Sequence, residues 1–188
     1  CPARCRADVP VRAFAAAHPD AQQRARDEVA AVLGGRAPTA DASTQLPWLT
    51  ATLKETLRLY PSIPLLMTRR TTADIEFAGY RIPKRTLVRI APWYLQRDER
   101  HFRAPEAFRP ERFLPGASPI PRGAWMPFGV GPRVCLGQHF AMLEMTIIAA
   151  MLLQRFVLSI DRPVSLKPVF HISLRPENGL RLLLTPHR

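Results

Sequence analysis

Residues 125–140, WMPFGVGPRVCLGQHF, place one cysteine, Cys135, among three glycines, two prolines and an arginine. A helical run is predicted to begin directly after it, at Leu136. A thiolate at that position faces free backbone N–H groups and the positive end of the helix dipole, and both favour the charged sulfur. Gly131 and Gly137 permit backbone angles and close approaches that other residues do not. The stretch therefore predicts a rigid loop that presents one sulfur to a flat ligand.

Two further side chains of this stretch suit such a ligand. Arg133 places a cation two residues before the cysteine, where it matches a carboxylate on the ligand. Phe128 is expected to screen the sulfur from water. The alternative interpretation is a buried structural thiol in a glycine-rich turn, and a lone cysteine does not decide between the two.

The spacing of these residues resembles that of a known family. The pattern Phe-x-x-Gly-x-Arg-x-Cys-x-Gly, from Phe128 to Gly137, matches the haem-binding signature of the cytochrome P450 family at every fixed position. The resemblance implies that haem b (iron protoporphyrin IX) is the cofactor and that the sulfur of Cys135 is the metal ligand. It also assigns cofactor binding to four residues around the cysteine: Phe128, Gly131, Arg133 and Gly137.

A second motif concerns a charge network. The sequence KETLR, residues 54–58, puts Glu55 and Arg58 on one helical face, which alone is typical of an exposed ion pair. It also resembles the Glu-x-x-Arg helix of the family, and FRPERF, residues 108–113, resembles the segment that supplies a third partner, Arg112. The resemblance implies a buried network of these three residues that holds an irregular segment over the haem-binding core. Such a network needs good geometry, because buried unpaired charges are costly.

The resemblance extends over residues 14–188. TRRTTADIEFAGYRIPKRT, residues 68–86, resembles a small sheet of the family, in which Arg69 matches a position that contacts a haem propionate. The alternative for Arg69 is a solvent-exposed arginine at a strand edge. SIPLLM (62–67) and VFHIS (169–173) resemble stretches that face a hydrophobic substrate, and ordinary core packing is their alternative.

Local patterns predict three main helices. The first begins near Pro19 and stops at Gly34 and Gly35. The second lies within residues 43–61, with Ser43 or Thr44 as its cap and Pro61 at its end. The third runs from Leu136 to about Phe156.

The remaining elements are expected to be short. A turn between strands is predicted at Ala78 and Gly79, and a hairpin within residues 171–186 turns at Asn178 and Gly179. The expected fold is mainly α with one small mixed β-sheet (α+β), the C-terminal half of the cytochrome P450 fold. Residues 1–13 are expected to form an irregular leader and residues 14–188 a partial haem-binding domain.

The composition limits the partners. The net charge of +12 is mostly arginine, dispersed among acidic residues and prolines, and no nucleic-acid-binding motif accompanies it. We therefore expect no specific nucleic-acid binding and instead a basic surface that docks an acidic protein. The longest apolar run is too short to cross a bilayer, so we expect no membrane span and a cytoplasmic location. Cys1 and Cys5 lack a second pair at metal-ligand spacing and are interpreted as incidental thiols.

The resemblance implies a haem-thiolate monooxygenase that inserts one oxygen atom of O2 into a hydrophobic small molecule. It also implies a flavoprotein or ferredoxin as electron donor, docked beside Arg133 and His139. Full-length members of the family are more than twice as long, and the helix that activates oxygen has no counterpart here, so no catalytic residue is assigned. We therefore expect the chain alone to bind haem weakly. The alternatives are a truncated, non-catalytic remnant that acts as a haem-binding or interaction module, and a haem sensor.

Overall fold

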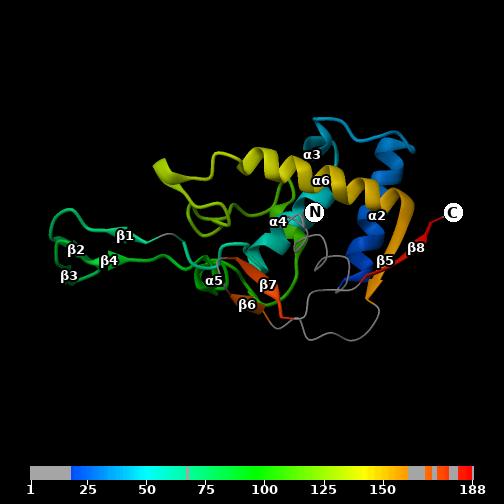
Figure 1. Ribbon diagram of the computed structural model, residues 1–188. Helices are drawn as coiled ribbons and strands as arrows, with labels where there is room; N and C mark the ends of the chain where they lie inside the picture. Colours follow the sequence, from blue (N-terminus) through cyan, green and yellow to red (C-terminus); the bar gives the residue numbers. More distant parts are fainter. Residues whose placement is uncertain (1–17, 67, 161–167, 171–172, 178–181, 188) are drawn as a thin grey trace.

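The computed structural model describes residues 18–66, 68–160, 168–170, 173–177 and 182–187. A helical body occupies one side of the molecule, and a narrow β arm projects from the other (Figure 1). The α-helices are α2 (Pro19–Leu33), α3 (Ala42–Gln45), α4 (Pro47–Leu59), α5 (Pro92–Leu95) and α6 (Gln138–Arg155). Two 3-10 helices are η1 (Pro110–Phe113) and η2 (Gly131–Arg133).

Helix α2 follows the sequence signals at both ends. Pro19 lies in its first turn, where a proline costs no hydrogen bond, and Asp20 faces the positive end of the dipole. Gly34 ends the helix with a φ of 53°, in the left-handed region that favours glycine. The prediction of this helix is confirmed.

Helix α4 begins differently from the prediction. Residues 42–45 form the separate helix α3, so the expected cap at Ser43 or Thr44 is wrong. Glu28 of α2 instead accepts the backbone N–H groups of Trp48 and Leu49, at 2.8 and 2.9 Å. The first turn of α4 is therefore capped by a side chain from another helix, which no local pattern reveals.

The core lies between α2, α4 and α6. Leucines recur every four residues along α4 and are buried, together with apolar residues of the two other helices. The fully buried members of this cluster include Ala25, Val29, Leu46, Leu49, Leu53 and Ala150. Strand β5 (Phe156–Ile160) extends the core through Leu158, which packs against the same cluster. These helices form the frame on which the functional loops lie.

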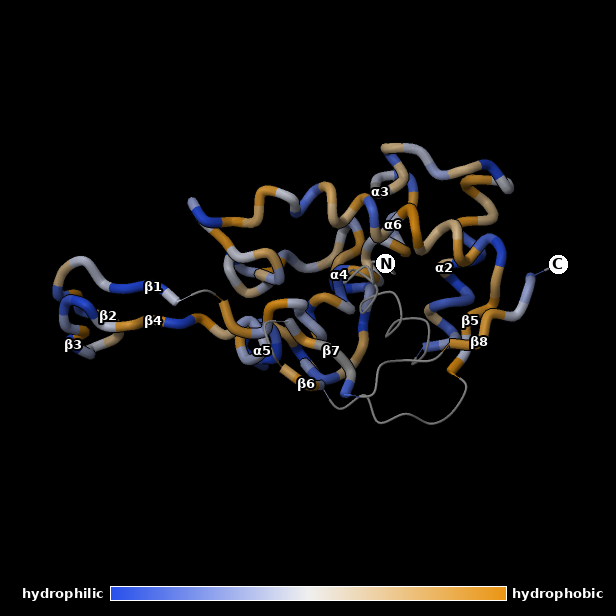
Figure 2. The backbone as a smooth tube through the Cα atoms, viewed as in Figure 1, coloured by the Kyte–Doolittle hydropathy of each residue, from blue (hydrophilic) through white to orange (hydrophobic). Residues whose placement is uncertain are grey.

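The β arm consists of two antiparallel pairs. Its strands are β1 (Arg69–Arg70), β2 (Ile75–Phe77), β3 (Tyr80–Ile82) and β4 (Leu87–Val88), with β1 paired to β4 and β2 to β3. Ala78 and Gly79 connect β2 to β3 with φ values of 51° and 81°, and this confirms the predicted turn. Figure 2 shows the hydrophilic β1 beside the more hydrophobic β4.

The strands near the C-terminus pair differently from the expectation. Strand β6 (Pro168–Phe170) pairs with β7 (Leu174–Pro176), and β5 pairs with β8 (Leu182–Pro186). The predicted hairpin within residues 171–186 is therefore wrong, since its two strands have other partners. Its turn residues, Asn178 and Gly179, lie outside the described residues.

The described strands form four antiparallel pairs rather than one mixed sheet. Pro168, Pro176 and Pro186 are terminal residues of β6, β7 and β8, and a proline offers no backbone donor to a ladder. The mainly helical fold itself is confirmed. None of the helices in the described part of the chain combines the length and the hydrophobicity that crossing a membrane requires.

Candidate cofactor site

Residues 125–137, which we call the cysteine loop, fold back on themselves before α6. The backbone N–H of Cys135 donates to the carbonyl oxygen of Phe128 at 2.9 Å, which closes the loop. Gly131 adopts a φ of 73°, a conformation in which a side chain would be strained. The loop thus brings the cysteine back beside Phe128, and α6 begins at Gln138, two residues later than predicted.

The sulfur of Cys135 is accessible. The cysteine is exposed and reduced, which contradicts the alternative of a buried structural thiol. A Cβ atom on Gly137 would lie 3.9 Å from the Sγ atom, in van der Waals contact. Glycine at this position therefore leaves that side of the sulfur uncovered.

A largely apolar cavity of about 440 Å³ opens at this sulfur. That volume lies within the range of roughly 300–1,000 Å³ typical of sites for small molecules and cofactors. The end of α4, the segment after it, the β arm and the cysteine loop supply the walls, with apolar side chains that include Leu57, Ile63, Leu66, Val88, Ile90 and Pro127. The cavity joins segments that are far apart in the sequence.

Four of the six residues predicted to bind a cofactor line this cavity: Arg69, Phe128, Arg133 and Cys135. Gly131 and Gly137 do not line it and instead shape the loop. Ser62, Ile63 and Leu66, from the stretch predicted to face substrate, lie in the wall. Of residues 169–173, the described ones are absent from the cavity's lining. Cys1 and Cys5 lie outside the described residues.

A flat, apolar cofactor with acidic substituents fits this arrangement. The thiol meets an apolar wall, and the exposed arginines Arg69 and Arg133 supply two cations to the same cavity. Phe128 is half-buried and its ring packs edge-on against Trp125, with centroids 6.4 Å apart, so its position beside the sulfur is fixed by packing. The donor set is a single sulfur, as thiolate-ligated haem requires.

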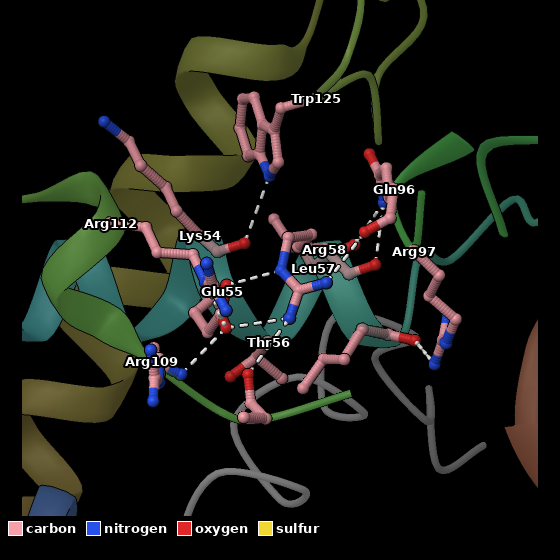
Figure 3. A network of polar contacts seen from close by, with 12 residues as sticks. Lys54, Glu55, Thr56, Leu57, Arg58, Gln96, Arg97, Arg109, Arg112 and Trp125 are labelled. Carbon is pink, nitrogen blue, oxygen red and sulfur yellow. Dashed lines mark hydrogen bonds and ion pairs between the residues drawn. The ribbon is translucent and has the colours of Figure 1, made fainter. Parts of the chain in front are cut away.

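Figure 3 shows the charge network around α4, the helix whose Leu57 lines the cavity. Glu55 and Arg58 are fully buried, and two hydrogen bonds of 2.7 and 2.9 Å join the guanidinium to the two carboxylate oxygens. Arg112 places its Nε atom 3.5 Å from Glu55 Oε1, the distance of an ion pair rather than of a short hydrogen bond. Burial lowers the pKa of Arg112, and the charge of Glu55 opposes that shift. The structure therefore brings all three predicted residues together.

The network also satisfies backbone groups of the irregular segment. Glu55 accepts the N–H of Arg109 at 2.8 Å, and Arg112 donates to the carbonyl oxygens of Arg103 and Ala104 at 2.6 and 2.8 Å. Arg58 donates to the carbonyl oxygen of Gln96 at 2.7 Å. The buried charges thus hold residues 96–112 against α4.

Two contacts of the cysteine loop were not predicted. Gln96 is fully buried and accepts the backbone N–H of Met126 at 2.8 Å. The indole N–H of Trp125 donates to the carbonyl oxygen of Lys54 at 3.2 Å. Gln96 and Trp125 are not part of a recognisable sequence motif. Their side chains bond to backbone atoms, and every residue has such atoms. In the sequence, a glutamine after a short helix would have been only a weak indication of this role.

Comparisons with known proteins identify the family of the chain. The Cytochrome P450 family model matches residues 13–184. Mouse Cytochrome P450 4V2 is 40% identical over 174 residues, which cover 89% of this chain and 32% of that protein. Probable cytochrome P450 4s3 of Drosophila melanogaster is 38% identical over 169 residues, which cover 90% of this chain and 33% of that protein. The solved structure of retinoic acid bound cyanobacterial CYP120A1 matches with a TM-score of 0.89 and 33% identity, over 96% of this chain and 42% of that one.

The fold is that of cytochromes P450, and the chain belongs to the cytochrome P450 family. The chain spans about a third of the length of the curated relatives it matches. Membership in the family implies a haem cofactor.

Proposed function

We propose that the chain contributes the thiolate-bearing side of a haem monooxygenase that acts on a hydrophobic small molecule. The observation that carries the proposal is that the exposed Cys135 lines an apolar cavity together with Arg69 and Arg133. Cys135 would hold the iron of haem b. The two arginines would pair with its propionates, and Phe128 would cover the sulfur.

Haem with a thiolate ligand supplies the chemistry that cleaves O2 and transfers one oxygen atom to a C–H bond. The chain's own part is to orient the sulfur and to surround the cofactor with apolar side chains. Helix α6 begins three residues after the cysteine, so the positive end of its dipole points towards the loop. The apolar wall excludes water and suits a hydrophobic substrate.

The surface around the cysteine loop supports docking of an electron donor. Arg133 and His139 are exposed there, and two large apolar side chains accompany them. Leu136 is 99% exposed and Phe140 is 70% exposed. Apolar residues beside cations suit an acidic protein with an apolar centre, such as a flavoprotein or a ferredoxin.

The test is a haem titration of the reduced 188-residue chain under carbon monoxide, compared with Cys135→Ser. We expect a thiolate-type absorption band that grows with added haem and is absent from the serine variant, because a serine hydroxyl is not an anionic sulfur ligand. Cys5→Ser is the matched control and should keep the band. A wild-type chain without the band, or a serine variant that retains it, would contradict the proposal.

A further inference from the structure

We propose that Gln96 is a positioning residue for the sulfur of Cys135 and acts through the backbone of the cysteine loop. The inference rests on the proposed function, because it concerns how accurately the sulfur is presented to haem. Gln96 directly follows α5 and is fully buried, although glutamine is usually exposed. A buried amide is stabilising only when its polar atoms are paired.

The side chain of Gln96 joins two elements. Its Nε2 atom donates to the carbonyl oxygens of Leu57 and Arg58 at 3.1 and 2.9 Å, and these belong to the last turn of α4, where backbone carbonyls have no partner within the helix. Figure 3 shows Gln96 beside Leu57 and Arg58 of α4. The Oε1 atom of Gln96 accepts the N–H of Met126 at 2.8 Å. The two ends of one amide therefore fix the start of the cysteine loop relative to the end of α4.

From this point a short path of backbone bonds reaches the sulfur. The carbonyl oxygen of Met126 accepts the N–H of Gly129 at 3.0 Å, and that of Phe128 accepts the N–H of Cys135 at 2.9 Å. Trp125 adds a neighbouring tether through its bond to Lys54. Backbone hydrogen bonds thus connect the beginning of the loop to Cys135, whose own carbonyl oxygen accepts the N–H of Gln138 at the start of α6 at 3.3 Å.

Gln96 also connects the loop to the charge network. Arg58 donates to the carbonyl oxygen of Gln96 at 2.7 Å, while the amide of Gln96 donates back to the carbonyl oxygen of Arg58. The residue thus contacts the buried ion pair on one side and the cysteine loop on the other. Only a side chain with both a donor and an acceptor makes all of these bonds. The carboxylate of a glutamate could still accept the N–H of Met126 but could not donate to α4, and the thioether of a methionine could do neither.

The chain offers a matched control in Gln22. This glutamine is also buried, and its amide also joins two elements, by bonds of 2.8 and 2.9 Å to the carbonyl oxygen and the N–H of Leu158 in β5. It lies on α2, away from the cysteine loop. Gln96→Met and Gln22→Met therefore remove equivalent groups from two different places.

The experiment measures amide hydrogen exchange by mass spectrometry on the 188-residue chain without haem. In Gln96→Met we expect exchange across residues 125–137 to be about tenfold faster, because a buried N–H loses its acceptor. Exchange in α2 and β5 should stay unchanged, and Gln22→Met should show the opposite pattern. The proposal is overturned if Gln96→Met leaves the exchange of the loop unchanged, or if Gln22→Met accelerates it equally.

A second measurement reads the sulfur directly. At equal haem occupancy, the fraction of the reduced carbon monoxide complex with the thiolate-type band should fall several-fold in Gln96→Met and stay near wild type in Gln22→Met. Equal losses in the two variants would overturn the positioning role. A wild-type chain without the band would overturn the proposed function alone, because the exchange measurement still tests the contact of Gln96 with the loop.

Discussion

Two arginine–carboxylate pairs in this molecule have nearly the same shortest N–O distance and opposite surroundings. In α4, Arg58 lies 2.7 Å from Glu55, and both side chains are fully buried. In the β arm, Arg81 lies 2.8 Å from Asp74, with side chains 75% and 49% exposed. The N–O distance is therefore a poor measure of how much each pair contributes to the stability of the fold. Burial decides it, because water screens the pair in the arm and cannot replace a lost partner in α4.

Removing the carboxylate charge should separate the two pairs most clearly. Glu55→Gln leaves the guanidinium groups of Arg58 and Arg112 without a buried counter-charge, so we expect the free energy of unfolding to fall by about 3–5 kcal/mol. Urea denaturation followed by circular dichroism measures it. Asp74→Asn is the matched change in the arm and should leave the urea midpoint unchanged. Equal losses in the two variants would show that burial does not distinguish the pairs.

A carboxylate of intermediate burial should have an intermediate effect. Glu28 is half-buried and caps the first turn of α4 from α2. Glu28→Ala should lower the free energy of unfolding by about 1 kcal/mol, as loss of an N-cap typically does. The same urea titration measures the change, and Asp27→Ala, on the exposed side of α2, provides the control. A loss as large as that of Glu55→Gln would contradict the ranking by burial.

The smallest effect is expected from a titrating group next to the network. His18 stacks on Phe108 with ring centroids 4.0 Å apart. Burial lowers the pKa of His18 and the charge of Glu55 only partly opposes this, so the unfolded chain takes up the proton more readily than the folded one. The contribution to stability is therefore complete above the ordinary pKa of about 6.5 and is lost as the pH falls towards the lower folded value.

The measurement for His18 is the urea midpoint between pH 7.5 and 5.5. His18→Phe keeps an aromatic ring against Phe108 but cannot titrate, so its midpoint should fall less than that of the wild type over this range. Identical pH dependence of the urea midpoint in the two proteins would show that folding does not change the pKa of His18. The comparison cancels the contributions of the other histidines.

The sequence predicted those features whose causes are local. The limits of α2 follow from Pro19 and Gly34, and the turn of the β arm from Ala78 and Gly79. The motif around Cys135 led to the family, which the comparisons confirm. The placement of Arg69 in the cavity wall and of Arg112 beside Glu55 was expected only through the resemblance.

The features that were missed depend on contacts between distant residues. The cap of α4 comes from Glu28, about twenty residues earlier, so Ser43 and Thr44 were the natural but wrong choices. Strand β8 pairs with β5 rather than with β7, the strand before it in the sequence. Proximity in the sequence alone therefore does not determine strand pairing. Gln96 bonds mainly to backbone atoms, and backbone acceptors carry no sequence signature.

Arg58 has a consequence for the order in which the chain assembles. Its guanidinium bonds to Glu55 within the same helix, but also to carbonyl oxygens of Gln96 and Ala107, which come from segments about forty and fifty residues later. Helix α4 can therefore form early, but its last turn becomes buried only when the segments of Gln96 and Ala107 pack against it. Docking of the irregular segment and dehydration of the arginine are then a single cooperative step, and this part of the protein should open and close as one unit.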